Sequence, residues 1–178
     1  MSKKLKIKIN NTEYQAHAGE SVLDLALREG IDIPHLCKHP DLSIKGNCRI
    51  CLVDVDGIGL TTSCSTKITD GMQIKTDTPK IKRARQTNLE MIYAQHTEQC
   101  SSCLYQDNCK LLNYLAKYDL KLTRYVDRKK NYPVWQFGDS IQFDASKCID
   151  CGNCLEICEQ QACNFYERAK RGVETVVK

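Results

Sequence analysis

The twelve cysteines of this 178-residue chain are gathered into three short groups, and this grouping limits what the chain can fold around. The groups span residues 37–64, 100–109 and 148–163, and many of the neighbouring cysteines are separated by only two or three residues. Disulfides tie distant segments together in small secreted proteins, whereas closely spaced thiolates from one loop converge on a metal centre. We therefore expect metal binding rather than disulfides.

The N-terminal residues contain lysines but lack the apolar segment and the small-residue cleavage site of a secretory signal. No apolar stretch approaches the roughly 20 residues that cross a bilayer. We therefore expect a cytoplasmic protein without a membrane span, in which thiols stay reduced.

Residues 1–77 are expected to form an α+β domain. The alternating apolar residues of segment 4–9 indicate a half-buried strand. Ser21 is a suitable N-cap for a helix that Gly30 ends, and Asp24 holds the N3 position of a capping box. The remaining strands of this domain are expected at residues 12–16, 49–57, 59–64 and 72–76.

Residues 78–118 are expected to form a small helical module around the second cysteine group. Thr78 and Pro79 are typical of a helix start, and a second helix is expected after Cys109. The apolar stripe of the first helix consists of Ile81, Ala84, Leu89, Ile92 and Tyr93.

Residues 119–140 are polar and contain Pro133 and Gly138, so we expect a linker there. Residues 141–178 form the last segment, in which a strand leads into the third cysteine group.

The first group places ten, two and twelve residues between its four cysteines. A [2Fe–2S] core needs four thiolates on two irons, and Gly46 would let backbone N–H groups approach the sulfurs. A four-cysteine zinc site is the alternative, but the long first loop on a strand-rich scaffold favours iron and sulfide. The expected ligands are Cys37, Cys48, Cys51 and Cys64.

This pattern resembles the [2Fe–2S] domain at the N-terminus of the complex I large iron–sulfur subunit. The same domain begins many [FeFe] hydrogenases, NAD-linked formate dehydrogenases and hydrogenase diaphorase small subunits. The ten-residue first spacing follows this family rather than plant ferredoxins. The resemblance implies a β-grasp fold for the domain.

The second group matches the next module of the same family, a [4Fe–4S] site held by one histidine and three cysteines in the pattern H-x3-C-x2-C-x5-C. The matching residues are His96, Cys100, Cys103 and Cys109. From the residues alone, His96 could instead serve as a cation near the negative end of a helix dipole. The resemblance favours ligation, and replacing a thiolate by a neutral imidazole should raise the reduction potential.

The third group follows the bacterial ferredoxin run, and a [4Fe–4S] cluster is expected on Cys148, Cys151, Cys154 and Cys158. Glu159 stands where such a run usually has proline, and Cys163 is an additional thiol. Hydrogenase-type relatives carry a second run further on, so this ferredoxin-like segment is expected to be incomplete. Cys158 is the expected fourth ligand, with Cys163 as its substitute.

The formal net charge of +4 describes the chain without its clusters. A four-thiolate cluster carries about −2 when oxidised, and one with a histidine ligand about −1. Three clusters would bring the total to roughly −1, so the charge does not indicate nucleic-acid binding.

The sequence contains no dinucleotide fingerprint and no visible active site of its own. We predict an electron-transfer subunit with one [2Fe–2S] and two [4Fe–4S] clusters. The resemblance implies a flavin subunit that binds NAD(P)H and a catalytic subunit of the hydrogenase or formate dehydrogenase type as partners, in anaerobic metabolism. The alternatives are a zinc-bound structural or nucleic-acid-binding module and the N-terminal segment of a longer [FeFe] hydrogenase.

Overall fold

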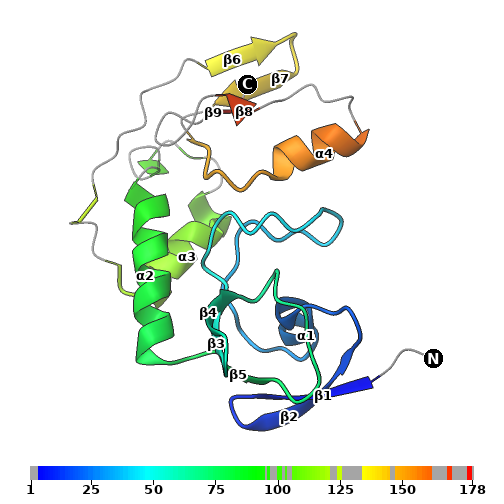
Figure 1. Ribbon diagram of the computed structural model, residues 1–178. Coiled ribbons are helices and arrows are strands. Elements are labelled where there is room, and N and C mark those ends of the chain that lie inside the picture. The colour runs from blue at the N-terminus through cyan, green and yellow to red at the C-terminus, as the bar shows by residue number, and fades with distance from the viewer. Residues whose placement is uncertain are drawn as a thin grey trace.

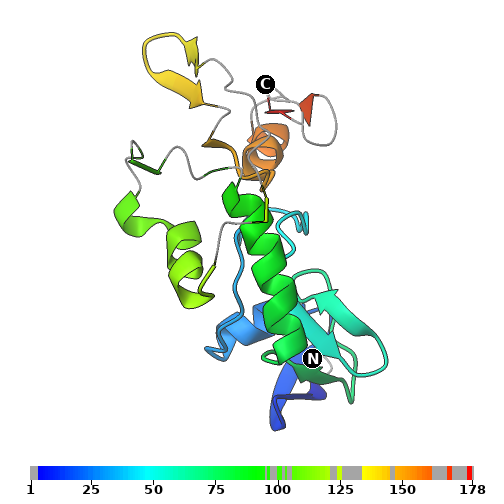
Figure 2. The same ribbon diagram turned by 90° about the vertical axis from the view of Figure 1, so that its left-hand side faces the viewer.

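The computed structural model describes residues 4–94, 96, 100–101, 103, 106–120, 124–125, 134–144, 147–161, 168–169 and 176–177. A long helix, α2 (Pro79–Ala94), follows the N-terminal sheet and precedes all the later elements. The N-terminal sheet, which has five strands, lies at the start of this helix, and α4 (Asn153–Gln161) lies towards its other end (Figures 1 and 2).

The N-terminal domain is a mixed sheet with the strand order β2-β1-β5-β3-β4. Central β1 and β5 are parallel, and the other neighbouring strands are antiparallel. Its strands are β1 (Lys4–Ile9), β2 (Thr12–His17), β3 (Leu52–Val55), β4 (Gly59–Thr62) and β5 (Gln73–Lys75).

The alternation predicted for residues 4–9 is confirmed, because Leu5, Ile7 and Ile9 are buried and the intervening lysines are exposed. Asn10 and Asn11 both have positive φ, as a two-residue hairpin turn requires. The buried face of the sheet packs against α1 (Val22–Arg28), whose apolar residues complete the core of this domain.

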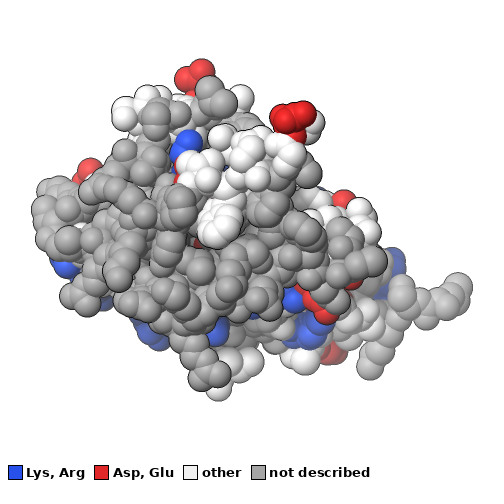
Figure 3. All heavy atoms as spheres, turned by 90° about the horizontal axis from the view of Figure 1, so that it is seen from above, with Lys and Arg blue, Asp and Glu red and all other residues white. Residues whose placement is uncertain are grey.

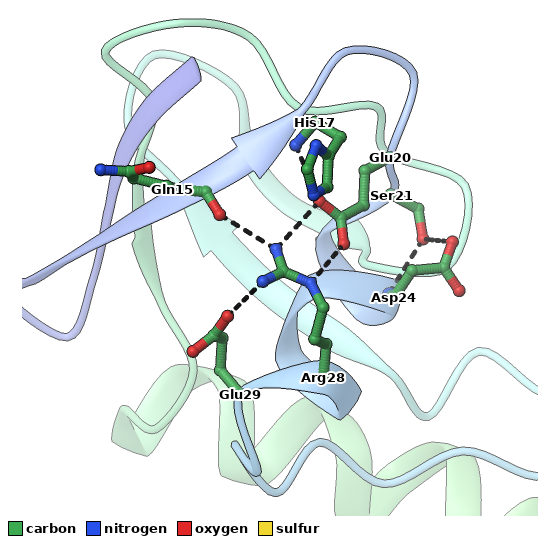
Figure 4. A network of polar contacts seen from close by, with 7 residues as sticks. All are labelled: Gln15, His17, Glu20, Ser21, Asp24, Arg28 and Glu29. Atoms are coloured by element: carbon green, nitrogen blue, oxygen red, sulfur yellow. Dashed lines mark hydrogen bonds and ion pairs between the residues drawn. The ribbon is translucent and has the colours of Figure 1, made fainter. Parts of the chain in front are cut away.

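The start of α1 is fixed by a pair of side chains (Figure 4). The Ser21 hydroxyl accepts the Asp24 N–H at 3.1 Å and donates to the Asp24 carboxylate at 2.6 Å. The prediction that Ser21 is the N-cap of α1 is therefore confirmed, and the Asp24 carboxylate bonds to the Ser21 hydroxyl. Burial raises the pKa of Asp24, but hydrogen bonds from Ser21 and Lys38 outweigh it and hold the pKa below its ordinary value.

The end of α1 is held by Arg28, as Figure 4 also shows. Its guanidinium donates to Glu20 at 3.1 and 3.2 Å and to the Gln15 carbonyl at 2.9 Å, and it pairs with Glu29. These bonds connect the helix to β2 and fix its orientation over the sheet.

We expect Ser21→Ala to lower the free energy of unfolding by about 1 kcal/mol, because the first turn of α1 loses its side-chain cap. Chemical denaturation of the anaerobic protein measures the change. Ser140→Ala removes an exposed serine and is the matched control. Equal stabilities of the two variants would contradict the capping role.

The start of α2 is capped as predicted, since the Thr78 hydroxyl accepts the Ile81 N–H at 3.2 Å. Ile81, Leu89 and Tyr93 of the predicted stripe are buried. Arg85, which the predicted stripe omitted, is buried on the same helix.

The later elements are short. They are the 3-10 helix η2 (Gln106–Asn108), α3 (Lys110–Lys117), β6 (Val134–Phe137), β7 (Ile141–Asp144), α4, β8 (Arg168–Ala169) and β9 (Val176–Val177). No helix in the described residues is long and apolar enough to cross a membrane.

One secondary-structure expectation was wrong. Residues 134–137 fall in the expected linker, but they form β6 and pair with β7 across a turn. Pro133 and Gly138 indicated breaks in the chain, whereas Gly138, with φ of +62°, makes the turn that joins the two strands.

On the face in Figure 3, the described lysine and arginine side chains are scattered among acidic and uncharged ones. The described part of this face therefore shows no continuous basic surface.

Candidate metal centres

The four cysteines of the first group lie in the interior of the N-terminal domain. Cys37, Cys48, Cys51 and Cys64 are 4%, 6%, 1% and 1% exposed, and all are free thiols. Cys51 and Cys64 belong to the core of the sheet domain, whereas Cys37 and Cys48 pack with side chains of α2 and α3. The group therefore lies where the domain meets the helices.

The four thiols form two hydrogen-bonded pairs. The Cys37 thiol donates to Cys48, which lowers the pKa of Cys48 to about 5 and raises that of Cys37. The Cys64 thiol likewise donates to Cys51, which lowers the pKa of Cys51 to about 7 and raises that of Cys64. In each pair, one sulfur therefore has a lowered pKa beside a second sulfur whose pKa is raised.

The loop before Cys48 directs backbone N–H groups towards sulfur. Gly46 has φ of +64°, a conformation that glycine adopts without strain. The N–H groups of Asn47 and Cys48 then donate to the Cys37 sulfur. Ile50 donates to the Cys48 sulfur in the same way. Such bonds stabilise thiolate ligands and help set a cluster's potential.

In the part of the chain that the structure describes, no three His, Cys, Asp or Glu side chains are grouped as around one metal ion. A [2Fe–2S] cluster makes a different demand, because it takes two cysteine sulfurs on each of two irons. The two buried thiol pairs fit that requirement: the pair of Cys37 and Cys48 would hold one iron, and the pair of Cys51 and Cys64 the other.

The second group lies between the end of α2 and the start of α3. The backbone N–H of His96 donates to the Tyr93 carbonyl at 2.9 Å, and Cys109 is the N-cap of α3. The Tyr93 hydroxyl lies 3.9 Å from the Cys100 sulfur. Burial, and then Cys100 and Cys109, raise the pKa of Tyr93 to about 12. The Cys100 sulfur thus lies close to Tyr93, and the Cys103 N–H donates to the Cys100 carbonyl at 3.2 Å.

The third group combines a tight turn with the start of α4. Asp150 and Gly152 have positive φ, and the Asp150 N–H donates to the Cys148 sulfur at 3.3 Å. Cys154 and Cys158 lie on α4. Burial raises the pKa of Cys154, and the nearby sulfurs of Cys151 and Cys158 raise it further. Cys151, Cys154 and Cys158 thus influence one another electrostatically, and Cys163 lies outside the described residues.

Residues 2–79 match the family model described as a 2Fe-2S iron-sulfur cluster binding domain. This segment is therefore similar to [2Fe–2S] cluster-binding domains. The matched segment covers the five-stranded sheet, α1 and all four cysteines of the first group.

Relatives extend the similarity beyond the [2Fe–2S] domain. The chain is 30% identical over 154 residues to a subunit of the NADH-quinone oxidoreductase of Rickettsia prowazekii, covering 86% of the chain and 23% of the relative. It is 32% identical over 180 residues to the NADP-reducing hydrogenase subunit HndD of Solidesulfovibrio fructosivorans, covering 97% of the chain and 31% of the relative. The chain thus spans less than a third of either relative and carries the N-terminal iron–sulfur region predicted from its cysteine pattern.

A solved structure shares the fold over nearly the full length of the chain. A chain in the crystal structure of NAD+-reducing [NiFe]-hydrogenase in the H2-reduced state aligns with a TM-score of 0.90 at 24% identity. The alignment covers 97% of this chain and 74% of that chain.

The [2Fe–2S] domain contacts the third cysteine group directly. The side-chain amide of Asn47 donates to the carbonyls of Asp150 and Cys151, both at 3.3 Å. Lys45 forms an ion pair with Glu156 of α4. Hydrogen bonds from Lys45 and Ser43 lower the pKa of Glu156 to about 2, so this carboxylate is charged at neutral pH. The loop that carries Cys48 is therefore also the docking surface for the third group.

Sequence reasoning missed the residues that join these groups. Arg85 had a detectable signal, because it lies four residues after Ile81 and four before Leu89, on the buried stripe of α2. Asn47 and Glu156 had none, since polar residues in a loop and on a short helix are ordinarily exposed.

Proposed function

We propose that this chain relays single electrons through one [2Fe–2S] and two [4Fe–4S] clusters within an oxidoreductase complex. When bound, such clusters accept and release one electron at a time. The proposal is supported chiefly by the two pairs of buried cysteine thiols in the N-terminal domain. Hydrogen bonds from Asn47 connect this domain to the third cysteine group. The central parallel β1–β5 pair, with α1 packed on the sheet, supports a β-grasp assignment for the domain.

Each cysteine group has its own role in this proposal. The first group holds the [2Fe–2S] cluster, and the set of one histidine and three cysteines holds a [4Fe–4S] cluster at the end of α2. The third group holds the other [4Fe–4S] cluster beside the loop of Asn47. Because Asn47 directly precedes Cys48 and bonds to the carbonyl of Cys151, its side chain gives a short path between the first and third groups.

The partners follow from the relatives. One relative is a subunit of an NADH-quinone oxidoreductase and another of an NADP-reducing hydrogenase. We infer that this chain likewise works in the cytoplasm between a flavin subunit that binds NAD(P)H and a catalytic subunit of the hydrogenase or formate dehydrogenase type.

Anaerobic purification of the full chain, followed by iron, sulfide and zinc analysis, tests the proposal. We expect about ten irons per chain with matching labile sulfide. Dithionite should reduce the purified protein, whereas NADH alone should not. A preparation with two zincs and no labile sulfide would establish the zinc-bound alternative, and rapid bleaching by NADH would show a nucleotide site in this chain.

We expect His96→Cys to retain the middle cluster and to lower its midpoint potential by on the order of 100 mV, because an anionic thiolate disfavours reduction more than a neutral imidazole does. A redox titration followed by EPR measures the shift. His17→Cys, at an exposed position of β2, is the control. Equal midpoints in the wild type and the His96 variant would show that His96 is not a ligand.

Asn47→Ala should loosen the third group, because both hydrogen bonds to the loop before α4 are lost. A loss of about 1 kcal/mol corresponds to roughly fivefold faster amide exchange when local opening limits it. Hydrogen–deuterium exchange of a peptide covering residues 147–156 is the readout. Asn113→Ala changes an exposed asparagine of α3 and should leave this peptide unaffected.

A further inference from the structure

Arg85 is a buried cation close to the [2Fe–2S] ligands. It lies in the middle of α2 and is 4% exposed. Its Nε and Nη2 atoms donate to the Leu52 carbonyl at 3.1 and 2.6 Å, and Nη1 donates to the Tyr118 hydroxyl at 3.2 Å. The guanidinium thus joins the strand after Cys51 to the end of α3.

The partners of this guanidinium are neutral. Leu52 offers a carbonyl and Tyr118 a hydroxyl. Asp32 and Asp77 line the same cavity of about 310 Å³ as Arg85, yet neither forms an ion pair with it, and Asp32 pairs with Lys117. A buried charge without an opposite charge is costly. The Arg85 guanidinium is therefore a buried cation with which no carboxylate of the described residues forms an ion pair.

A cluster on the first cysteine group would supply the opposite charge, because Cys51 directly precedes Leu52. A [2Fe–2S] cluster on four thiolates carries about −2 when oxidised and about −3 after it gains one electron. Leu52 directly follows Cys51, so the covalent path keeps the guanidinium within roughly 12 Å of the Cys51 sulfur. Ile50 and Tyr118 are buried in one apolar cluster with Cys37 and Cys48, so water screens this interaction weakly.

From this geometry we propose that Arg85 raises the reduction potential of the [2Fe–2S] cluster through its charge. Reduction adds one electron and no proton to the cluster. A fixed nearby cation therefore stabilises the reduced form more than the oxidised form. Arg85 is not a ligand of the cluster. Its charge acts on the reduction potential of the [2Fe–2S] cluster from a fixed position on α2.

The test compares two variants of the full chain by EPR-monitored redox titration. Arg85→Gln keeps hydrogen-bond donors near Leu52 but removes the charge. We expect its cluster to be about tenfold harder to reduce, which is a midpoint 59 mV lower for one electron. Arg85→Lys keeps the charge but not the planar fork, and should retain the wild-type midpoint. Arg83→Gln removes an exposed cation of the same helix and is the matched control.

The inference rests on the proposed function, in which the first cysteine group holds a [2Fe–2S] cluster. Different results would contradict the presence of this cluster and the role of Arg85. Absence of the [2Fe–2S] EPR signal from wild-type protein would overturn the proposed function. An intact signal with equal midpoints in wild type and Arg85→Gln would overturn the role of Arg85 alone. If Arg85→Gln takes up no cluster, Arg85→Lys decides. A cluster tenfold harder to reduce in Arg85→Lys would show that hydrogen bonds, and not charge, set the potential, and an unchanged midpoint would support the proposal.

Discussion

Replacement of Cys48 by serine is expected to remove the [2Fe–2S] cluster, lowering the iron content by about two of roughly ten atoms per chain. Cys48 is the sulfur whose pKa is lowered to about 5, first by the Cys37 thiol and also by backbone N–H groups of Ile50, Cys37 and Leu36. These hydrogen bonds favour the thiolate form of Cys48. A serine hydroxyl does not ionise there at neutral pH, so one iron loses half of its protein ligands.

The loss should be confined to the first cluster. Iron and sulfide analysis gives its size, and EPR shows which signal disappears. Cys163→Ser is the matched control, because it replaces a thiol outside the first group and should leave the [2Fe–2S] signal unchanged. A Cys48→Ser protein with a wild-type [2Fe–2S] signal would contradict the assignment of the first group. Loss of the third cluster as well would show that docking through Asn47 and Lys45 depends on the occupied first site.

The local features of the N-terminal domain followed from sequence because they depend on neighbouring residues. Alternating side chains make β1, two asparagines make its turn, and Ser21 caps α1, each through contacts within a few positions. The four cysteines of the first group could be singled out for a related reason, because their spacing appears in sequence as a pattern. The structure buries all four, and their role as cluster ligands stays a prediction.

The contacts between modules were not predictable in this way. Asn47 meets the carbonyl of Cys151 across 104 positions of sequence, and Arg85 meets Tyr118 across 33. Both bonds depend on how α2 places one module against another, which no local pattern encodes. Strand β6 was missed for a similar reason, since four residues beside a proline are a strand only because β7 pairs with them.

The position of Cys158 on α4 bears on the fourth ligand of the third cluster. Cys154 and Cys158 are four residues apart on one helix, so their side chains lie on the same face. Cys158 is 4% exposed, and its sulfur contributes to the raised pKa of Cys154 together with Cys151. Cys158 thus lies on the buried side of α4, on the same helix face as Cys154. This arrangement supports Cys158 as the fourth ligand, with Cys163 as the substitute.

We therefore expect Cys158→Ala to reduce the third cluster's iron content by about one to four atoms, because a three-cysteine site loses iron readily, while Cys163→Ala leaves it intact. Iron analysis and EPR of each anaerobically purified variant measure the effect. A third cluster that survives Cys158→Ala but disappears in the double variant would show that Cys163 replaces the missing sulfur. If neither single change nor the double change affects that cluster, its fourth ligand comes from elsewhere, and the assignment of Cys158 is wrong.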